Sequence, residues 1–209
     1  MEEHKLIMKE ACVKRFAVAK EAIDNCLANS NKETILVGID GKCASGKTTL
    51  GYYLKGLYNC NLFHLDDFFL QGYQRTNERL SQVGGNVDYE RFEKEVMRPV
   101  LSREDVLYRP YSCMEGKIKE EILIKKHRLN IMEGSYSLHP YFHDPYDVKI
   151  FMNINEEDQI ENIRKRNCEE KLQRFIAEWI PKENLYFDSF RIAEGCIQIE
   201  WKKHWKKHC

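Results

Sequence analysis

The stretch GKCASGKT, at residues 41–48, constrains the fold more than any other feature of the chain. It matches the pattern G-x-x-x-x-G-K-[ST], which forms a phosphate-binding loop when a strand precedes it and a helix follows it. The apolar run at 35–39 has the length of a buried strand, and residues 48–58 show a helical pattern. A chance match in a glycine-containing turn would lack these neighbours. The stretch therefore predicts nucleotide binding within an α/β fold.

The residue types within this loop each suit a nucleotide. Glycine at both ends allows the backbone N–H groups to turn inward around an anion, at the positive end of the following helix. Lys47 is expected to reach the outer phosphates, and the Thr48 hydroxyl is a hard oxygen ligand of the kind that Mg²⁺ takes. ATP and Mg²⁺ are the predicted cofactors, with GTP left open as the nucleotide. The loop residues predicted to bind the nucleotide are Gly41, Ala44, Ser45, Gly46, Lys47, Thr48 and Thr49.

Three further apolar runs, at residues 61–65, 129–132 and 147–154, alternate with helical patterns. Short strands that alternate with helices predict a mainly parallel sheet covered by helices on both faces, which makes a three-layer sandwich. We expect one domain over residues 1–209, beginning with an amphipathic helix within residues 1–30.

Three other segments are expected to lie outside the sheet. Residues 71–85 are polar with several glycines, and residues 108–116 are rich in proline and aromatic side chains, so both are interpreted as loops over a site. The tail WKKHWKKHC, residues 201–209, has a composition that can bind nucleic acid or anionic lipid. Because the tail is short and the rest of the chain is neutral, we interpret it as the end of a terminal helix.

Acidic residues stand at the ends of the first three predicted strands. Asp40 ends the first, Asp66 and Asp67 follow the second, and Glu133 ends the third. In an open α/β sheet the ligand lies beyond the carboxyl ends of the strands, so these acids are expected to face the phosphates. A kinase needs one carboxylate to accept the proton of the attacking hydroxyl and another to hold the magnesium shell, and Asp66 and Glu133 suit these roles. A lone strand-end acid is more often a helix cap or a turn former, but acids at three strand ends beside one loop favour catalysis.

The strings GIDGKCASGKTT, HLDDFF and IMEGSY together resemble the uridine kinase family of P-loop kinases. That family includes nicotinamide riboside kinases and relatives of pantothenate kinase and phosphoribulokinase, and the resemblance runs from about Ile35 to about Arg166. It implies the P-loop NTPase fold, Asp66 as the catalytic base, and Glu133 beside the magnesium and the reacting hydroxyl. It also implies that Asp88, in VDYERF, binds the sugar hydroxyls of a nucleoside.

The same resemblance implies a small lid rich in arginine after the fourth strand, at about residues 156–180. Arg164 and Arg166 are the predicted lid residues, the first at the nucleotide and the second at the transferred phosphoryl group, since a planar guanidinium suits phosphate oxygens. A solvated helix face is the alternative for each of them. One motif departs from the family, because RPYS at 109–112 lacks the acid of the P-x-Y-D segment. Its Tyr111 is still expected to stack on a base or a sugar.

The composition of the chain argues against nucleic acid, membranes and zinc as partners. Lysine plus arginine and aspartate plus glutamate total 33 each, so no global field attracts nucleic acid or an anionic membrane. The eight cysteines show no CxxC pair, which fits reduced thiols rather than a zinc site, and Cys43 is expected to be a small residue that fits the loop. No apolar window approaches the ~20 residues of a membrane span, and the N-terminus lacks the apolar stretch of a signal peptide. We expect a cytoplasmic protein whose partner is a small-molecule substrate.

Four functions compete on this sequence. A nucleoside kinase would use Asp66 as general base, Asp88 on the sugar, and ATP with Mg²⁺ as donor. A kinase of another hydroxylated metabolite, such as pantothenate or nicotinamide riboside, is the nearest alternative. A hydrolytic or regulatory NTPase would need no acceptor, but the N-K-x-D motif and switch glutamine of GTPases are lacking. A non-catalytic nucleotide-binding module would have no use for Lys47, Thr48 and Glu133 together with Asp66.

Overall fold

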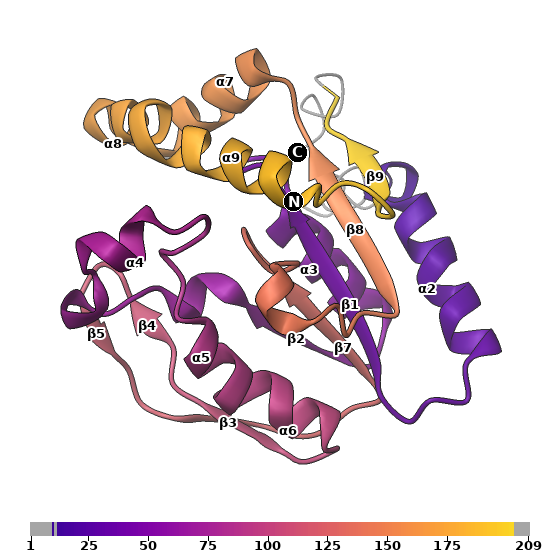
Figure 1. Ribbon diagram of the computed structural model, residues 1–209. Helices are drawn as coiled ribbons and strands as arrows, with labels where there is room; N and C mark the ends of the chain where they lie inside the picture. The colour runs from indigo at the N-terminus through magenta and orange to yellow at the C-terminus, as the bar shows by residue number, and fades with distance from the viewer. Residues whose placement is uncertain (1–9, 11, 203–209) are drawn as a thin grey trace, which may run out of the picture.

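A computed structural model describes residue 10 and residues 12–202 of the chain (Figure 1). Its centre is a five-stranded sheet in which all strands run parallel, in the order β2-β7-β1-β8-β9. The strands are β1 (Ile35–Gly41), β2 (Cys60–His64), β7 (Leu129–Glu133), β8 (Val148–Asn153) and β9 (Ile197–Glu200). The predicted α/β fold with a mainly parallel sheet is confirmed.

Strand β1 lies in the middle of the sheet and is buried along its whole length. It pairs with β7 on one side, where Ile35 lies opposite Leu129, and with β8 on the other, where Val37 lies opposite Val148. A strand with neighbours on both edges and helices on both faces meets no water, so its sequence is a nearly continuous apolar run. The loop after β1 therefore emerges at the centre of the carboxyl edge of the sheet.

Two helices, α2 (Ala17–Asn29) and α3 (Lys47–Leu57), cover one face of the sheet. Successive side chains of a strand point to opposite faces, and alternate residues of β1 point toward these helices. In Figure 1 α3 lies behind the sheet, and α2 lies beside β8. The buried cluster on this face includes Phe16, Ile23, Ile35, Val37, Ile39, Leu50 and Leu54.

The opposite face is covered by α5 (Tyr89–Phe92), α6 (Arg98–Leu101) and α9 (Ile180–Phe190). A π-helical turn, Glu93–Met97, joins α5 and α6 into one helical stretch. In Figure 1 this stretch crosses the lower part of the face, and α9 crosses its upper end. Helix α9 therefore lies over the carboxyl ends of the strands.

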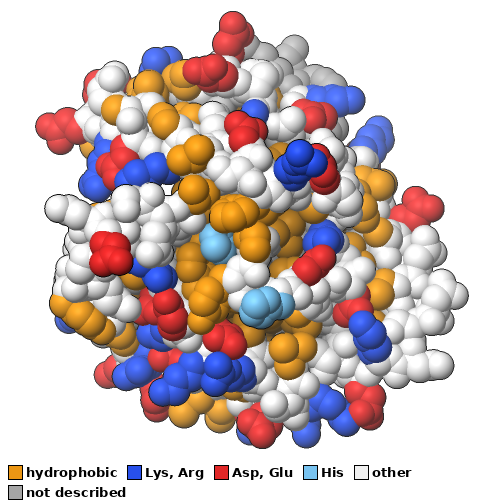
Figure 2. Space-filling view, in the orientation of Figure 1, with side chains coloured by type: hydrophobic (Ala, Val, Ile, Leu, Met, Phe, Trp, Pro, Cys, Tyr) orange, Lys and Arg blue, Asp and Glu red, His pale blue; other side chains and the backbone are white. Residues whose placement is uncertain are grey.

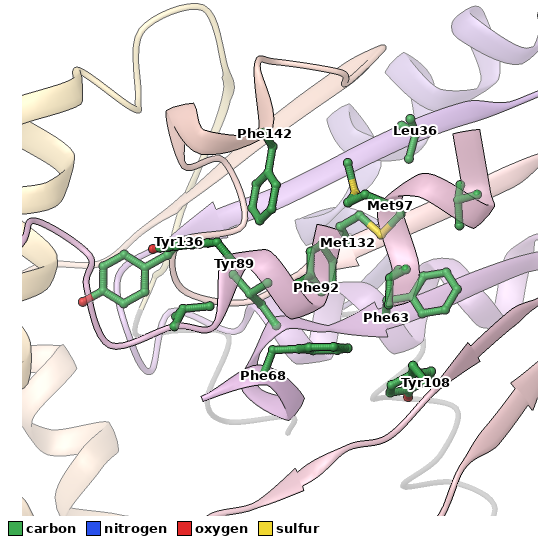
Figure 3. Packing of buried hydrophobic residues seen from close by; sticks show 14 of the residues in the cluster. Leu36, Phe63, Phe68, Tyr89, Phe92, Met97, Tyr108, Met132, Tyr136 and Phe142 are labelled. Atoms are coloured by element: carbon green, nitrogen blue, oxygen red, sulfur yellow. The ribbon is translucent and has the colours of Figure 1, made fainter. Parts of the chain in front are cut away.

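Aromatic side chains dominate the core on that second face (Figure 3). Phe68 packs edge-on against Phe92, with ring centroids 4.9 Å apart. His139 is stacked between Tyr89 and Tyr186, at centroid distances of 4.4 and 5.6 Å. Figure 2 shows apolar side chains gathered over the middle of this face, with charged side chains around its margin. The aromatic contacts join α5, α9 and the segment after β7 into one packed unit.

Short hairpins and helical turns complete the described chain. Strand β3 (Val106–Tyr108) pairs antiparallel with β6 (Ile122–Ile124), and β4 (Tyr111–Ser112) pairs antiparallel with β5 (Lys117–Ile118). The remaining helices are α4 (Asn77–Ser81), α7 (Glu156–Arg166) and α8 (Glu169–Arg174), with a π-helical turn at Phe175–Trp179 and 3₁₀ turns at Leu65–Phe68, Gly72–Gln74 and Pro140–Phe142. Among the described residues, every helix is too short or too polar to cross a bilayer.

The structure corrects the prediction for the C-terminal tail. Residues 197–200 form β9, and the Trp201 and Lys202 that follow are not helical. The Trp201 N–H donates to the carbonyl oxygen of Asn153 (2.8 Å), which continues the pairing with β8. A terminal helix is therefore wrong for these residues, and residues 203–209 lie outside the described part. Sheet pairing with β8 decides the conformation here.

The other predicted segments are partly correct. Helical structure covers residues 12–15 and α2, while residues 1–9 and 11 of the predicted N-terminal helix lie outside the described residues. The stretch 71–85 is not all loop, because it holds a 3₁₀ turn and α4. Likewise, β4 lies within the stretch 108–116.

Candidate active site

The phosphate-binding loop lies where β1 ends and α3 begins, as predicted. Gly41 and Gly46 have φ angles of +132° and +99°, which residues with side chains rarely adopt. A Cβ atom on Gly41 would also lie 2.1 Å from the carbonyl oxygen of Met152. The backbone therefore requires glycine at both positions, and the loop leads into the N-terminus of α3, whose first N–H groups have no acceptor within the helix.

Lys47 is the first residue of α3, and its side chain is buried against the loop. Its ammonium group donates to the carbonyl oxygens of Gly41 (2.6 Å) and Lys42 (3.1 Å). The hydroxyl of Ser45, buried in the same loop, has no hydrogen-bond partner among the residues that the structure describes. A buried ammonium group and an unpaired buried hydroxyl beside the N-terminus of a helix fit an anion such as a nucleotide phosphate.

Thr48 and Glu133 lie together beside the loop. The Thr48 hydroxyl donates to Oε2 of Glu133 (3.4 Å), and Oε1 of Glu133 pairs with Nδ1 of His64. The hydrogen bond to Glu133 raises the pKa of His64. No group of three metal-binding side chains occurs in the described part of the chain, so Mg²⁺ held by Thr48 and Glu133 would take its other ligands from phosphates and water.

Two adjacent carboxylates, Asp66 and Asp67, lie in the 3₁₀ turn after β2. Asp67 is half-buried and accepts a hydrogen bond from the Tyr108 hydroxyl (3.3 Å). Asp66 is exposed and accepts no hydrogen bond from the described residues. Although solvent reaches its carboxylate, the protein atoms around it raise its pKa, with Glu133 adding to the effect and Lys47 opposing it. Asp66 is therefore the acid of this pair that is free to meet a ligand.

Asp40 behaves differently from Asp66. Its carboxylate is completely buried, and the donors to it come from three loop N–H groups and one hydroxyl. Burial raises the pKa of Asp40 to about 6, although these donors oppose the shift. The expectation that all strand-end acids face the phosphates is therefore wrong for Asp40, which holds the segment after β7 in place. Its four donors are Gly41 N, Tyr136 N, Leu138 N and Tyr186 Oη, at 2.7, 3.1, 3.0 and 2.8 Å.

Asp88, the predicted sugar-binding residue, is the N-cap of α5 and is buried. Its backbone N–H donates to the carbonyl oxygen of Phe68 (2.7 Å), which places it beside the turn that carries Asp66. One carboxylate oxygen accepts from the N–H of Arg91 (3.1 Å), and the other accepts from the side chain of Gln74 (2.8 Å). A sugar hydroxyl that binds Asp88 would have to share or displace these donors.

The remaining predicted residues lie at the edges of the site. Tyr111 is buried in β4, so a ligand that stacks on it needs a movement of this hairpin. Arg164 and Arg166 lie in the last turn of α7, where both side chains are exposed and neither forms an ion pair within the described part of the chain. Their predicted contacts with the nucleotide and the phosphoryl group stay predictions.

Comparison with known proteins yields matches only among solved structures. No protein-family model matches the chain, and no curated protein matches its sequence. A protein described as a possible uridine kinase, from Bacillus stearothermophilus, aligns with 18% identity and a TM-score of 0.63 over 87% of this chain and 98% of its own. A candidate fructose transport system kinase from Silicibacter sp. TM1040 aligns with 17% identity and a TM-score of 0.69 over 90% and 98% of the two chains. The protein YGR205w aligns with 14% identity and a TM-score of 0.60 over 91% and 94%.

The fold is that of P-loop kinases. At such low identity these likenesses establish the arrangement of the sheet and its helices, and the chemistry rests on the residues of this chain.

Contacts between the phosphate-binding loop and distant helices were not predicted. Gln159 and Asn162 of α7 donate to the carbonyl oxygens of Cys43 (3.1 Å) and Ala44 (3.2 Å), and Glu183 of α9 accepts from the N–H of Cys43 (2.8 Å). A polar residue on a charged helix has the pattern of a solvated side chain, so the sequence carries no local signal for these contacts.

Cys43 lies at the centre of these contacts. Its side chain is buried with Ile163, Leu172 and Ile180 in a small apolar cluster that joins α7, α8 and α9 to the loop. Burial raises the pKa of the Cys43 thiol to about 12. A protonated, buried thiol is a poor nucleophile, so packing is the role that the structure supports for Cys43.

Proposed function

We propose that this protein is an ATP- and Mg²⁺-dependent kinase that phosphorylates a hydroxyl group of a small molecule, with the 5′-hydroxyl of a nucleoside as the acceptor. The observation that carries the proposal is the free carboxylate of Asp66, exposed and without a hydrogen-bond donor among the described residues, beside a phosphate-binding loop. Phosphoryl transfer to a hydroxyl needs a base at this place, whereas a conformational switch does not.

The residues around the loop would have different roles in the transfer of the phosphoryl group. When bound, ATP with Mg²⁺ supplies the phosphoryl group and neutralises part of its charge. Lys47 and the N–H groups where the loop enters α3 would hold the phosphates, and Thr48 and Glu133 would hold the metal. Asp66 would accept the proton of the acceptor hydroxyl as that oxygen attacks. Its raised pKa makes it a better proton acceptor than an ordinary aspartate, provided that it is ionised at the working pH.

The acceptor side supports a nucleoside through Asp88. This residue lies beside the turn that carries Asp66, and the resemblance to uridine kinases assigns the matching carboxylate to sugar hydroxyls. Arg166 would stabilise the transferred phosphoryl group and Arg164 the nucleotide when the lid closes over the loop. Pantothenate and nicotinamide riboside are the alternatives within the same reaction class.

A panel of acceptors tests this proposal. The purified protein is incubated with ATP and Mg²⁺ and with uridine, cytidine, nicotinamide riboside, pantothenate or fructose, and ADP release is followed against an acceptor-free blank. Fructose is included because the name of one similar structure mentions it. We expect a nucleoside to raise ADP release above the blank. Brisk ADP release that no acceptor changes would instead indicate an NTPase.

A further inference from the structure

Glu183 of α9 is a buried carboxylate that reaches the phosphate-binding loop. Its side chain is only 5% exposed, and both of its oxygens accept hydrogen bonds. Oε2 accepts from the N–H of Cys43 (2.8 Å), and Oε1 accepts from the hydroxyl of Ser135 (2.5 Å). Within the described part of the chain, Glu183 forms no ion pair with a lysine, arginine or histidine.

A buried carboxylate without a cationic partner destabilises the folded state unless hydrogen bonds replace its hydration. Helix α9 does not need this carboxylate as an anchor, because Ile180 and Phe187 pack into the apolar clusters, and the Tyr186 hydroxyl donates to Asp40 (2.8 Å). Glu183 is therefore poorly explained as a residue that attaches the helix. The groups that it bonds give a better explanation.

The two donors to Glu183 belong to the two segments that flank the predicted nucleotide phosphates. Cys43 is the third residue of the phosphate-binding loop, and Ser135 follows two residues after Glu133. Glu183 therefore ties the outer turn of the loop to the segment that carries the predicted metal ligand. The carbonyl oxygen of Cys43 accepts from Gln159 of α7 (3.1 Å), so helices α7 and α9 hold the two peptide groups on either side of the Cys43 Cα.

We propose that Glu183 is a positioning residue for nucleotide binding. By accepting from Cys43 and Ser135, it holds the phosphate-binding loop and the segment after β7 at the separation that a nucleotide phosphate with its metal requires. The bonds are charge-assisted, which makes them stronger and shorter than those of a neutral acceptor. The inference depends on nucleotide binding by the loop, which is one part of the proposed function, and it does not depend on which acceptor is phosphorylated.

Equilibrium binding of ATP in the presence of Mg²⁺, measured by calorimetry without an acceptor, tests the inference. Glu183→Ala removes both bonds and is expected to raise the Kd for ATP about tenfold, since one decade in Kd matches the free energy of a hydrogen bond to a charged group. Glu183→Gln keeps an acceptor oxygen for Cys43 and is expected to raise the Kd less. Ser135→Ala removes one donor and should fall between the wild type and Glu183→Ala.

Glu178→Gln is the matched control. Glu178 precedes Glu183 on the same helical stretch, and its carboxylate pairs with Arg174 and Lys182 on the surface rather than with the loop. We expect this variant to bind ATP as the wild type does. Melting temperatures without nucleotide are measured in parallel, because a merely structural role would lower them and leave the Kd unchanged.

Three results would overturn the inference. One is a folded Glu183→Ala protein whose Kd for ATP equals that of the control, and another is a lowered melting temperature with an unchanged Kd. If Glu183→Ala does not fold, the inference is tested with Ser135→Ala and Glu183→Gln. A wild-type Kd for ATP in both of these variants would contradict it. If the wild type binds ATP and every variant binds it with the same Kd, this inference is wrong and the proposed function is unaffected. If the wild type binds no ATP, the proposed function is wrong as well.

Discussion

Asp40 lies at the end of the central strand, where four donors converge on a carboxylate that water does not reach. Three of those donors are backbone N–H groups, so the carboxylate fixes the course of the phosphate-binding loop and of the segment after β7. An asparagine of the same shape would turn an NH₂ group toward these donors. The residue is therefore needed as an acceptor at both oxygens, in spite of the cost of burying its charge.

This burial makes a prediction for stability against pH. The pKa of Asp40 is about 6 in the folded protein, against ~3.9 in an unfolded chain. Because the folded state holds this proton more tightly, the contribution of Asp40 to the free energy of unfolding is fully present below pH ~4 and is lost as the pH rises through about 6. The difference between these two pKa values corresponds to a change of about 3 kcal/mol in the free energy of unfolding.

Urea unfolding of the wild type and of Asp40→Asn between pH 4 and 8 measures this contribution. We expect the variant to be less stable throughout, and the gap between the two proteins to shrink by up to about 3 kcal/mol as the pH rises. Other titrating groups are shared by both proteins and cancel in the difference. Parallel stability curves over this range would contradict the assigned pKa.

Helix α7 carries the two arginines that are predicted to act in a lid. Arg164 and Arg166 are exposed at its last turn, while the Lys165 between them pairs with Glu161 four residues earlier (2.6 Å). Their guanidinium groups are available to a ligand because the described residues offer them no carboxylate within ion-pair distance.

Steady-state kinetics of alanine variants separate these three side chains. Arg166→Ala is expected to lower kcat about 10²-fold, as the loss of a donor to a developing charge does. Arg164→Ala should mainly raise the KM for ATP, and Lys165→Ala serves as the control with near wild-type kinetics. All three side chains are exposed, so the melting temperatures should stay close together. If Arg166→Ala and Lys165→Ala behave alike, the lid assignment is wrong.

The sequence was informative where local pattern decides structure. The central strands were predictable because strands buried on both faces need continuous apolar runs. The loop at 41–48 was predictable because its glycines adopt φ angles that other residues avoid. Strand β9 and the antiparallel pairs with strands of two or three residues could not be predicted, because most of their pairing depends on residues distant in the chain.

The site shows the same limit at the level of single contacts. Asp40 and Asp66 are both strand-end aspartates, and only the packed structure distinguishes the buried acceptor from the free carboxylate. The bond between Glu183 and Cys43 spans 140 positions in the chain, so no spacing rule indicates it.

At the scale of the whole molecule, the central sheet differs from the segment of the predicted lid in how much apolar surface it buries. Two large apolar clusters hold helices on both faces of the sheet. Helices α7 and α8 instead meet the phosphate-binding loop through the small cluster around Cys43 and through the hydrogen bonds of Gln159 and Asn162. Segments with few buried apolar contacts open at low free-energy cost. Such an arrangement would suit the proposed kinase, whose predicted lid would admit the nucleotide and then exclude water from the transfer.

The identity of the reaction product tests the central claim most directly. The wild type, Asp66→Asn and Asp67→Asn are each incubated with ATP, Mg²⁺ and the acceptor panel, and the acceptors are then examined by mass spectrometry. Asp67 is the matched control, since it is the adjacent aspartate and already accepts from the Tyr108 hydroxyl.

We predict that the wild type and Asp67→Asn add one phosphoryl group to a nucleoside, while Asp66→Asn forms that product at least about 10²-fold more slowly. All three proteins hydrolysing ATP equally, with no acceptor gaining a phosphoryl group, would contradict the account.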